Sequence, residues 1–339
     1  MMRELLAKCI EGKTLSEAQA EEVMNSIMAG DATPSQIASL VSILRLRGET
    51  VDEIVGFTKS MKNHMTSIYY DNDVIDTCGT GGDGASTFNI STAAAIVVSA
   101  LKVKVAKHGN RAFSSKSGSA DVLETLGINI QTSNEEAIKS LNDQNMSFLF
   151  APMFHSSMKH AVNPRKEIGF RTVFNLLGPL ANPANAKRQV IGVFSTEYAE
   201  KMAEALKRLG SEHVLLVTGR DGLDEISISG ETDVVELKNG EITRYVLHPN
   251  DVGLFVGDIE ELKVNNAQES AKLIEAIFRG NGPKSAENIV AVNAAAALYV
   301  ANYVPSIADG VIFAKEAIRN GKALQQLKIL RHQREEHYA

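Results

Sequence analysis

The chain has 339 residues, of which 44% are hydrophobic and 22% charged, as in ordinary globular proteins. Its formal net charge of −6 argues against a general nucleic-acid binder, because such proteins carry an excess of basic residues. Two cysteines cannot form a disulfide framework, and neither a secretory signal nor a long apolar run is present, so we expect a cytoplasmic protein with no nucleic-acid or membrane partner.

The first 66 residues are predicted to form four short helices. Apolar stripes at residues 37–44 and 54–61 indicate that these helices bury one face each. Gly30 and Gly48 stand where the second and third helices should end. Because four short helices bury little surface alone, we expect them to pack against the rest of the chain or a second subunit. Three capping-box pairs mark helix starts: Ser16 with Gln19, Thr33 with Gln36, and Thr50 with Glu53.

From residue 73 onward, strand and helix signals alternate, which predicts a mostly parallel central sheet with flanking helices. An antiparallel hairpin is expected across an Asn239-Gly240 turn, and a polar tail should fray from Arg331. Expected strands end at residue 75 or span 103–106, 148–150, 190–194, 214–218, 234–237 and 242–246. Expected helices span 120–126, 135–141, 198–209, 267–279, 286–304 and 307–320.

These patterns predict an α/β protein with two domains. A small helical domain is expected at residues 1–66 and a larger α/β catalytic domain at 73–339, of which the segment near 160–185 can pack with the helices.

A glycine-rich loop lies between the apolar run at 74–75 and an Ala-rich helix that should begin near Ser91. Glycines let a backbone approach an anion, and a helix start offers unpaired N–H groups with a favourable dipole. The stretch therefore predicts a sugar-phosphate site, with a solvent-exposed glycine turn as the alternative. Its glycines are Gly79, Gly81, Gly82 and Gly84, and its polar residues are Asp83, Thr87, Asn89, Ser91 and Thr92.

A second polar loop, residues 107–121, follows the next expected strand and should lie beside the glycine loop, because ligands bind outside the carboxyl ends of parallel strands. Its mixture of cations and hydroxyls suits an anionic ligand. Taken alone, this composition slightly favours an ordinary basic surface loop, so the prediction of an anion site depends on the glycine loop beside it. It contains Lys107, Arg111, Lys116, Ser114, Ser115, Ser117 and Ser119.

Two further features suggest ligands. Asp224 and Glu225 follow the strand expected at 214–218 and are candidate Mg²⁺ ligands, the alternative being a solvated acidic turn. Arg165 follows Pro164 at an apparent helix start, where its guanidinium could fork onto a carboxylate. Cys78 is interpreted as a small buried residue rather than a nucleophile. No metal is assigned to histidines, since the spacing of His108, His155 and His160 fits no ligand pattern.

Several motifs in this order resemble those of the anthranilate phosphoribosyltransferase family over essentially the whole chain. They are GTGGD at 79–83, NIST at 89–92, KHGNR at 107–111, NPR at 163–165, FNLLGPLANP at 174–183 and the Asp224-Glu225 pair. The resemblance implies transfer of phosphoribose from 5-phosphoribosyl 1-pyrophosphate (PRPP) to the amine of anthranilate in tryptophan biosynthesis. It also implies an Mg²⁺ cofactor and a homodimer formed through the helical part.

The same resemblance implies roles by position. Residues that would bind PRPP are Gly79, Gly82, Asp83, Thr87, Asn89, Ile90, Ser91, Thr92, Lys107, His108, Gly109, Asn110, Arg111, Ala112, Phe113, Ser114, Ser115 and Ser119. Anthranilate would meet Gly79, Asn110 and Arg165, and Mg²⁺ would bind Ser91, Asp224 and Glu225. No general base is indicated, as befits a mechanism of positioning and electrostatics.

Two rival functions remain at this point. A pyrimidine nucleoside phosphorylase shares the fold, but Arg165 and the KHGNR motif disfavour it. A non-catalytic relative that binds nucleic acid is disfavoured by the intact glycine loop, the acidic pair and the net charge of −6.

Overall fold

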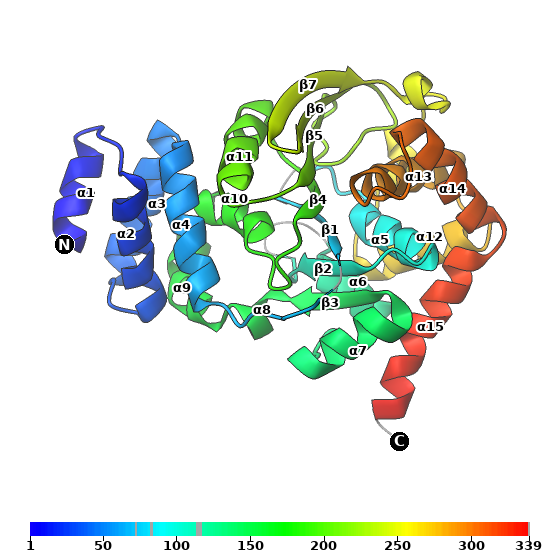
Figure 1. Cartoon of the computed structure of the whole chain (residues 1–339), viewed down its shortest axis with the longest axis horizontal. Coiled ribbons are helices and arrows are strands. Elements are labelled where there is room, and N and C mark those ends of the chain that lie inside the picture. The colour runs from blue at the N-terminus through cyan, green and yellow to red at the C-terminus, as the bar shows by residue number, and fades with distance from the viewer. Residues whose placement is uncertain (72, 82–83, 113–116, 338–339) are drawn as a thin grey trace.

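The computed structural model describes residues 1–71, 73–81, 84–112 and 117–337. At one end lies a bundle of four helices, α1 (Met2–Ile10), α2 (Glu17–Ala29), α3 (Pro34–Arg47) and α4 (Val51–His64) (Figure 1). All three predicted capping boxes are present, and the caps are Ser16, Thr33 and Thr50. Gly30 ends α2 in the left-handed conformation at φ 84°. The bundle is therefore specified locally, by its helix ends.

The centre is a seven-stranded sheet in the order β3-β2-β1-β4-β5-β6-β7. The first five strands pair in parallel and the last two antiparallel. Their bounds are β1 (Ile75–Gly79), β2 (Val105–Gly109), β3 (Met146–Phe150), β4 (Arg188–Gly192), β5 (His213–Gly219), β6 (Thr232–Lys238) and β7 (Glu241–Leu247).

Each strand expected from the sequence is found, with shifted ends. The largest difference concerns β1, which begins rather than ends at Ile75, because its polar residues are buried in the sheet instead of forming a loop. The hairpin turn is as predicted, with positive φ at Asn239 (50°) and Gly240 (82°), as a type I′ turn requires.

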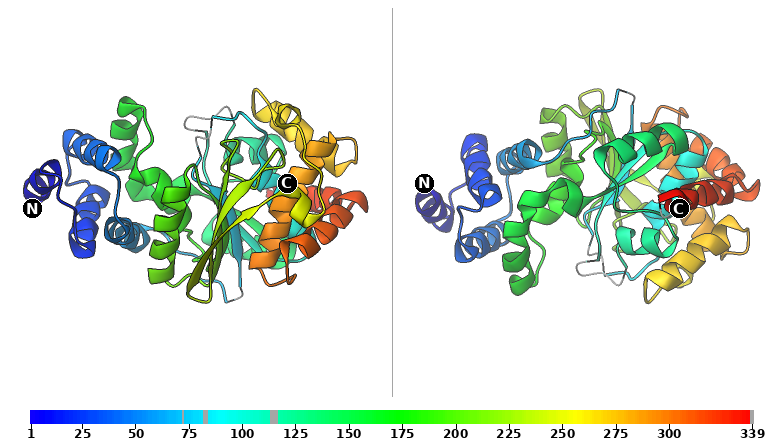
Figure 2. Two further views of the ribbon diagram at one scale, coloured as in Figure 1. Left: turned by 90° about the horizontal axis from the view of Figure 1, so that it is seen from above. Right: turned by 90° about the horizontal axis from the view of Figure 1, so that it is seen from below.

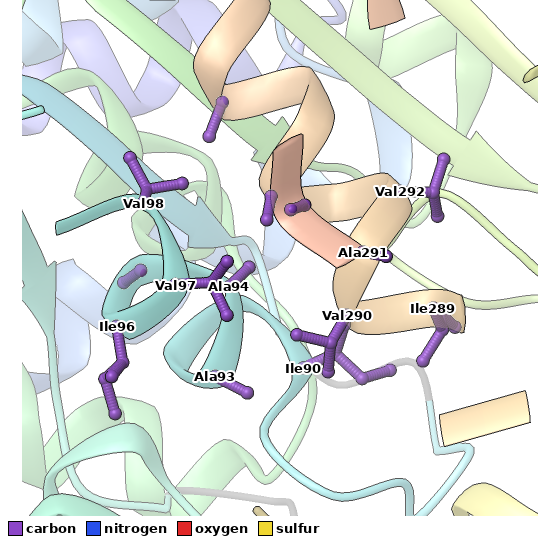
Figure 3. Close-up of a cluster of buried hydrophobic side chains, with 14 of the residues drawn as sticks. Ile90, Ala93, Ala94, Ile96, Val97, Val98, Ile289, Val290, Ala291 and Val292 are labelled. Carbon is purple, nitrogen blue, oxygen red and sulfur yellow. The ribbon is translucent and has the colours of Figure 1, made fainter. Parts of the chain in front are cut away.

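Helices cover both faces of the sheet, and alternate strand residues belong to two different cores. Val190 and Leu215 face a core built on α5 (Ile90–Ala100) and α13 (Lys284–Val300), whose small and branched side chains interlock in Figure 3. This face also carries α6 (Ser119–Thr125), α12 (Ala267–Phe278), α14 (Ile307–Arg319) and α15 (Lys322–His337). The frayed tail expected from Arg331 is wrong, because α15 continues the helix to His337.

Ile191 and Leu216 face the opposite core, which the sheet shares with the helical bundle. Here α10 (Val173–Leu180) and α11 (Thr196–Arg208) lie between the sheet and the bundle (Figure 2). The remaining helix beside the sheet, α7 (Asn134–Gln144), packs on β3. Two short 3₁₀ turns, η2 (Pro249–Val252) and η3 (Ile259–Leu262), belong to the other face, where they pack against α14 and α13. Among the described helices, none combines the length and apolar character needed to cross a bilayer.

The connection from β3 to β4 is helical, which the sequence did not predict in detail. It contains α8 (Ala151–Phe154), the 3₁₀ turn η1 (Ser156–Met158), α9 (Lys159–Ile168) and α10. The expectation that Arg165 begins a helix is wrong: Pro164 lies inside α9 and Arg165 in its last turn, where a cation interacts favourably with the helix dipole.

Candidate active site

A cavity of about 520 Å³ opens where β1, β2 and β3 end, and the turn after β5 also reaches it. Most residues predicted from the sequence line this one cavity, namely Gly79, Thr87, Asn89, Ile90, Ser91, Lys107, His108, Gly109, Asn110, Arg111, Ala112, Ser119, Arg165, Asp224 and Glu225. The predicted residues Gly82, Asp83, Phe113, Ser114 and Ser115 lie outside the described residues. Thr92 does not line the cavity, since its side chain is fully buried within α5.

The acidic turn and the glycine loop are joined directly. Gly81 N donates to Asp224 Oδ2 at 2.8 Å, and Ser91 N, at the start of α5, donates to Glu225 Oε1 at 3.1 Å. A Cβ at Gly79 would lie 2.6 Å from Asp224 Oδ2, so a side chain there would displace this carboxylate. Both carboxylates are thereby fixed at the mouth of the loop, and their hard oxygens are of the kind that Mg²⁺ prefers.

Lys107 differs from its prediction as a loop cation. It lies within β2 with only 1% of its surface exposed, and its Nζ donates to Thr77 O and, at 3.2 Å, to Ser91 Oγ. Burial lowers the pKa of this ammonium, and the nearby Asp76 carboxylate opposes that shift. Cys78 is buried as predicted, and burial raises the pKa of its thiol, which keeps it a thiol rather than a nucleophile.

The second loop is held by carboxylates of its own chain. Arg111 Nη1 pairs with Asp121 at 2.9 Å and with Glu124 at 2.8 Å, while 42% of the arginine side chain stays exposed. These two carboxylates raise the pKa of the guanidinium. Asp121 Oδ2 also accepts from Gly118 N and Ala112 N. Arg111, predicted to bind an anion, thus also orders its own loop.

Asn89 connects the glycine loop to its surroundings. Its Oδ1 accepts from Ser117 Oγ at 2.8 Å and from Ser270 Oγ at 2.9 Å, and its Nδ2 donates to Ser117 O. Ser270 belongs to α12, so one amide ties both loops to the helical face of the sheet.

Part of the cavity is apolar, and this part was missed by sequence reasoning. We call its contributing residues the apolar lining: Met61, Pro152, Met158, Val162, Phe174 and Pro179. Arg165 lies among them with its guanidinium carbon 5.1 Å from the Phe174 ring centroid. Burial lowers the pKa of Arg165 to about 10, so it stays charged at neutral pH. The FNLLGPLANP motif contributes to this lining, but its mostly apolar residue types do not by themselves indicate a binding site.

Two histidines also line the cavity, with ring centroids 5.1 Å apart. Burial lowers the pKa of His108 to about 3 and that of His155 to about 4, so both rings are neutral near pH 7. His108 forms a hydrogen bond with the backbone of Gly178, and His155 with the backbone of Ala181. The Nε2 atom of neither ring has a hydrogen-bond partner among the described residues. His108 therefore brings no positive charge to a phosphate. Within the described ranges, no cluster of three or more His, Cys, Asp or Glu side chains could hold a metal ion.

Comparisons with known proteins agree with this arrangement. Residues 3–65 match the helical bundle domain of the glycosyl transferase family, and residues 71–324 match its a/b domain. An anthranilate phosphoribosyltransferase of Geobacillus kaustophilus is 65% identical over 331 residues, covering 98% of this chain and 98% of the relative. The chain belongs to the anthranilate phosphoribosyltransferase family.

Solved structures of the family share the whole architecture. The anthranilate phosphoribosyltransferase of Thermus thermophilus is 41% identical and superposes with a TM-score of 0.90 over 96% of this chain and 98% of that one. The enzyme of Saccharomyces cerevisiae in complex with PRPP and Mg is 28% identical, with a TM-score of 0.88 over 99% and 98%. The two domain types and the mostly parallel sheet expected from the sequence are thus confirmed.

Proposed function

We propose that this cavity transfers the phosphoribosyl group of PRPP to the amine of anthranilate, giving N-(5-phosphoribosyl)anthranilate and pyrophosphate for tryptophan biosynthesis. One observation carries the proposal: a single cavity joins a glycine loop bonded to two carboxylates with an apolar lining that holds the half-buried Arg165. PRPP is rich in phosphate, whereas anthranilate is an aromatic ring with one carboxylate. Each substrate needs one of these two chemistries.

The donor is assigned to the polar residues of the cavity. The start of α5 attracts anions through the helix dipole, although the N–H groups of Gly81 and Ser91 donate to Asp224 and Glu225 in this structure. Lys107 adds a buried cation beside Ser91. In this assignment PRPP meets Gly79, Thr87, Asn89–Ser91 and the second loop from Lys107 to Ala112, with Ser119. Gly82, Asp83, Thr92 and residues 113–115 remain assigned by resemblance.

An Mg²⁺ ion fits the donor set of Ser91, Asp224 and Glu225. Two carboxylates alone make an incomplete site, and Mg²⁺ usually completes such a site with substrate phosphates. Ser91 Oγ accepts from Lys107 Nζ, and a hydroxyl oxygen has a second lone pair for a cation. When bound, the ion neutralises charge on the leaving pyrophosphate.

The acceptor is assigned to the apolar lining, where Arg165 would fork onto the carboxylate of anthranilate and Asn110 and Gly79 would lie at the amine. A desolvated guanidinium suits this role, since its attraction to a carboxylate grows as water is excluded. The rings of His108 and His155 are neutral, so the cations on this side of the cavity are Arg165 and Lys159, and only a guanidinium can fork onto a carboxylate.

The chemistry follows from alignment. The amine nitrogen forms a bond to C1′ while the C1′–O bond to pyrophosphate breaks, and its electron pair leaves with pyrophosphate. The amine then loses one proton. Because the nucleophile and the leaving group are both competent, the residues of this chain mainly orient two substrates and stabilise charge as C1′ becomes oxocarbenium-like.

Assembly and location extend the proposal. We propose a cytoplasmic homodimer formed through the helical bundle. The stripes at 37–44 and 54–61 pack against the rest of this chain, which was the first of the two alternatives expected from the sequence, so a dimer would use other residues of the bundle. Leu46 and Ile10, 91% and 75% exposed on α3 and α1, are the apolar side chains that a partner would cover. Light scattering should give a dimer at micromolar concentration, Leu46→Glu should weaken it, and a monomeric wild type would contradict the proposal.

The decisive test of the reaction is anthranilate fluorescence. The purified protein should consume anthranilate only when PRPP and Mg²⁺ are both present, and excess chelator should stop the reaction. Phosphate-dependent cleavage of thymidine is the control for a nucleoside phosphorylase. Thymidine cleavage without anthranilate consumption would overturn the assignment.

A further inference from the structure

Strands β1 and β2 separate after one position of their parallel pairing. They are in register only at Ile75 and Val105, where Ile75 N donates to Lys104 O at 2.9 Å. On their other sides both strands stay paired along their full five-residue lengths, β1 with β4 and β2 with β3. The separation thus lies between the two strands that lead into the glycine loop and the second loop.

Side chains occupy the places of the missing backbone bonds. In a regular parallel ladder the next bonds would join Thr77 of β1 to Ala106 O and His108 N of β2. Instead Asn182 Nδ2 donates to Ala106 O at 2.9 Å. Asp76 Oδ1 accepts from His108 N at 3.1 Å.

These two side chains also bond to each other. Asn182 Nδ2 donates to Asp76 Oδ2 at 2.8 Å, and Asn182 Oδ1 accepts from Ala184 N at 2.8 Å. Asp76 is 0% and Asn182 3% exposed, so a buried polar pair stands between two strands with both carboxylate oxygens and the amide satisfied. We call this pair the Asp76–Asn182 wedge.

The gap that the wedge opens is used by Lys107. Its Nζ donates to Thr77 O, which a ladder would have paired with His108 N, and it reaches on to Ser91 Oγ. If β1 and β2 were fully paired, Thr77 O would already accept from His108 N, and Lys107 would have to share this acceptor with the ladder. Neither wedge residue lines the cavity, so the wedge acts on the cavity through the strand backbones.

We propose that the Asp76–Asn182 wedge is a positioning device for the donor substrate. It holds the ends of β1 and β2 apart, which sets the spacing of the glycine loop and the second loop and directs Lys107 toward Ser91. Asn182 comes from the FNLLGPLANP motif, which otherwise contributes to the apolar lining, so this motif serves both substrates. The inference builds on the proposed function.

The test separates positioning from stability. Asn182→Leu keeps the approximate shape but removes both donors, and Asp76→Asn keeps the shape with one acceptor fewer. We expect Asn182→Leu to raise both the KM and the calorimetric Kd for PRPP about tenfold, since two buried hydrogen bonds hold the spacing. The KM for anthranilate should change far less, and Asp76→Asn should give an intermediate effect.

The matched control is Gln326→Leu, which removes a buried amide that donates to Gln144 O away from the cavity. It should lower the Tm and leave both KM values unchanged. If folded Asn182→Leu binds PRPP as the wild type does, the wedge is structural only and the proposal is wrong. If that variant does not fold, Asp76→Asn decides by the same criterion. A wild type that binds PRPP but does not consume anthranilate would instead contradict the proposed function.

Discussion

The polar residues of the cavity and its apolar lining are built in opposite ways. The polar residues come from the ends of β1, β2 and the turn after β5, and hydrogen bonds such as Gly81 N to Asp224 tie them together. The apolar lining comes from α4 and from the α8–α10 connection, and its one guanidinium lies against Phe174. Where charge must be neutralised, the fold ties many polar groups together by hydrogen bonds, and where a ring must be recognised, it sets one half-buried guanidinium among apolar side chains.

Among the polar residues of the cavity, we expect the largest loss of activity from a substitution in the acidic pair, Asp224 and Glu225. Asp224→Asn removes a charge from the polar residues and should lower kcat/KM on the order of 100-fold or more, because electrostatic stabilisation of the leaving group is lost. Titration of Mg²⁺ in the fluorescence assay measures this effect. Glu231→Gln is the control, since that carboxylate pairs with Arg220 on the surface and does not line the cavity. Full activity of Asp224→Asn in excess chelator would contradict the metal assignment.

The apolar lining is tested by Arg165. Arg165→Ala should lose about 1.5–3 kcal/mol of anthranilate binding, or about 10- to 150-fold in KM, the usual range for a hydrogen bond to a charged group. The KM for PRPP should change far less, and Arg165→Lys should recover only part of the loss because an ammonium cannot fork. Arg171→Ala, which removes an arginine stacked on Phe194 outside the cavity, should change neither KM. An unchanged anthranilate KM in both Arg165 variants would place the acceptor elsewhere.

As the pH falls below 6.5, protonation of the buried histidines should destabilise the folded protein. The pKa of His155 falls from the unfolded 6.5 to about 4 on folding, so the unfolded state binds more protons between these values. The stabilisation is complete above pH 6.5 and is lost as pH falls toward 4. We expect the free energy of unfolding to drop by on the order of 2 kcal/mol over this range, with a shallower drop in His155→Asn. Urea titrations at several pH values measure the free energy of unfolding. If it falls equally steeply with pH in the wild type and in His155→Asn, the lowered pKa of His155 is wrong.

The smallest effect is expected at Arg111. Its ion pairs with Asp121 and Glu124 are partly exposed, so Arg111→Ala should cost less than about 1 kcal/mol of stability. Because Arg111 also lines the cavity, the KM for PRPP should rise, though less than kcat/KM falls in Asp224→Asn. Thermal unfolding and steady-state kinetics give the two quantities. A stability loss with no change in KM would mean that Arg111 only orders its own loop.

Local signals made much of this fold predictable. The helix ends of the bundle follow from serine and threonine caps three residues before Gln or Glu, an interaction contained within one helical turn. The hairpin follows from Asn239-Gly240 for the same reason. Backbone preferences of neighbouring residues decide such features, so the sequence alone suffices.

The failures share a cause as well. The sequence predicts Lys107 as a loop cation, but Lys107 is a buried strand residue because the β1–β2 gap gives its ammonium two acceptors. Proline usually stands at a helix start, which predicts that Arg165 begins a helix, yet the buried Pro164 lies inside α9. The apolar lining and the Asp76–Asn182 wedge depend on contacts between distant segments. Such contacts cannot be predicted from residue type and spacing along the sequence.

The core that the bundle shares with the sheet also bears on how the chain could be divided. It includes Phe57 of α4, Leu177 of α10 and Leu216 of β5, so the two parts are joined by packing and not only by the connecting segment. Tyr69 in that segment is 88% exposed, which makes its backbone accessible to a protease or to a designed break. Two separately expressed fragments that meet at this position should therefore reassemble into an active complex without a covalent link between them.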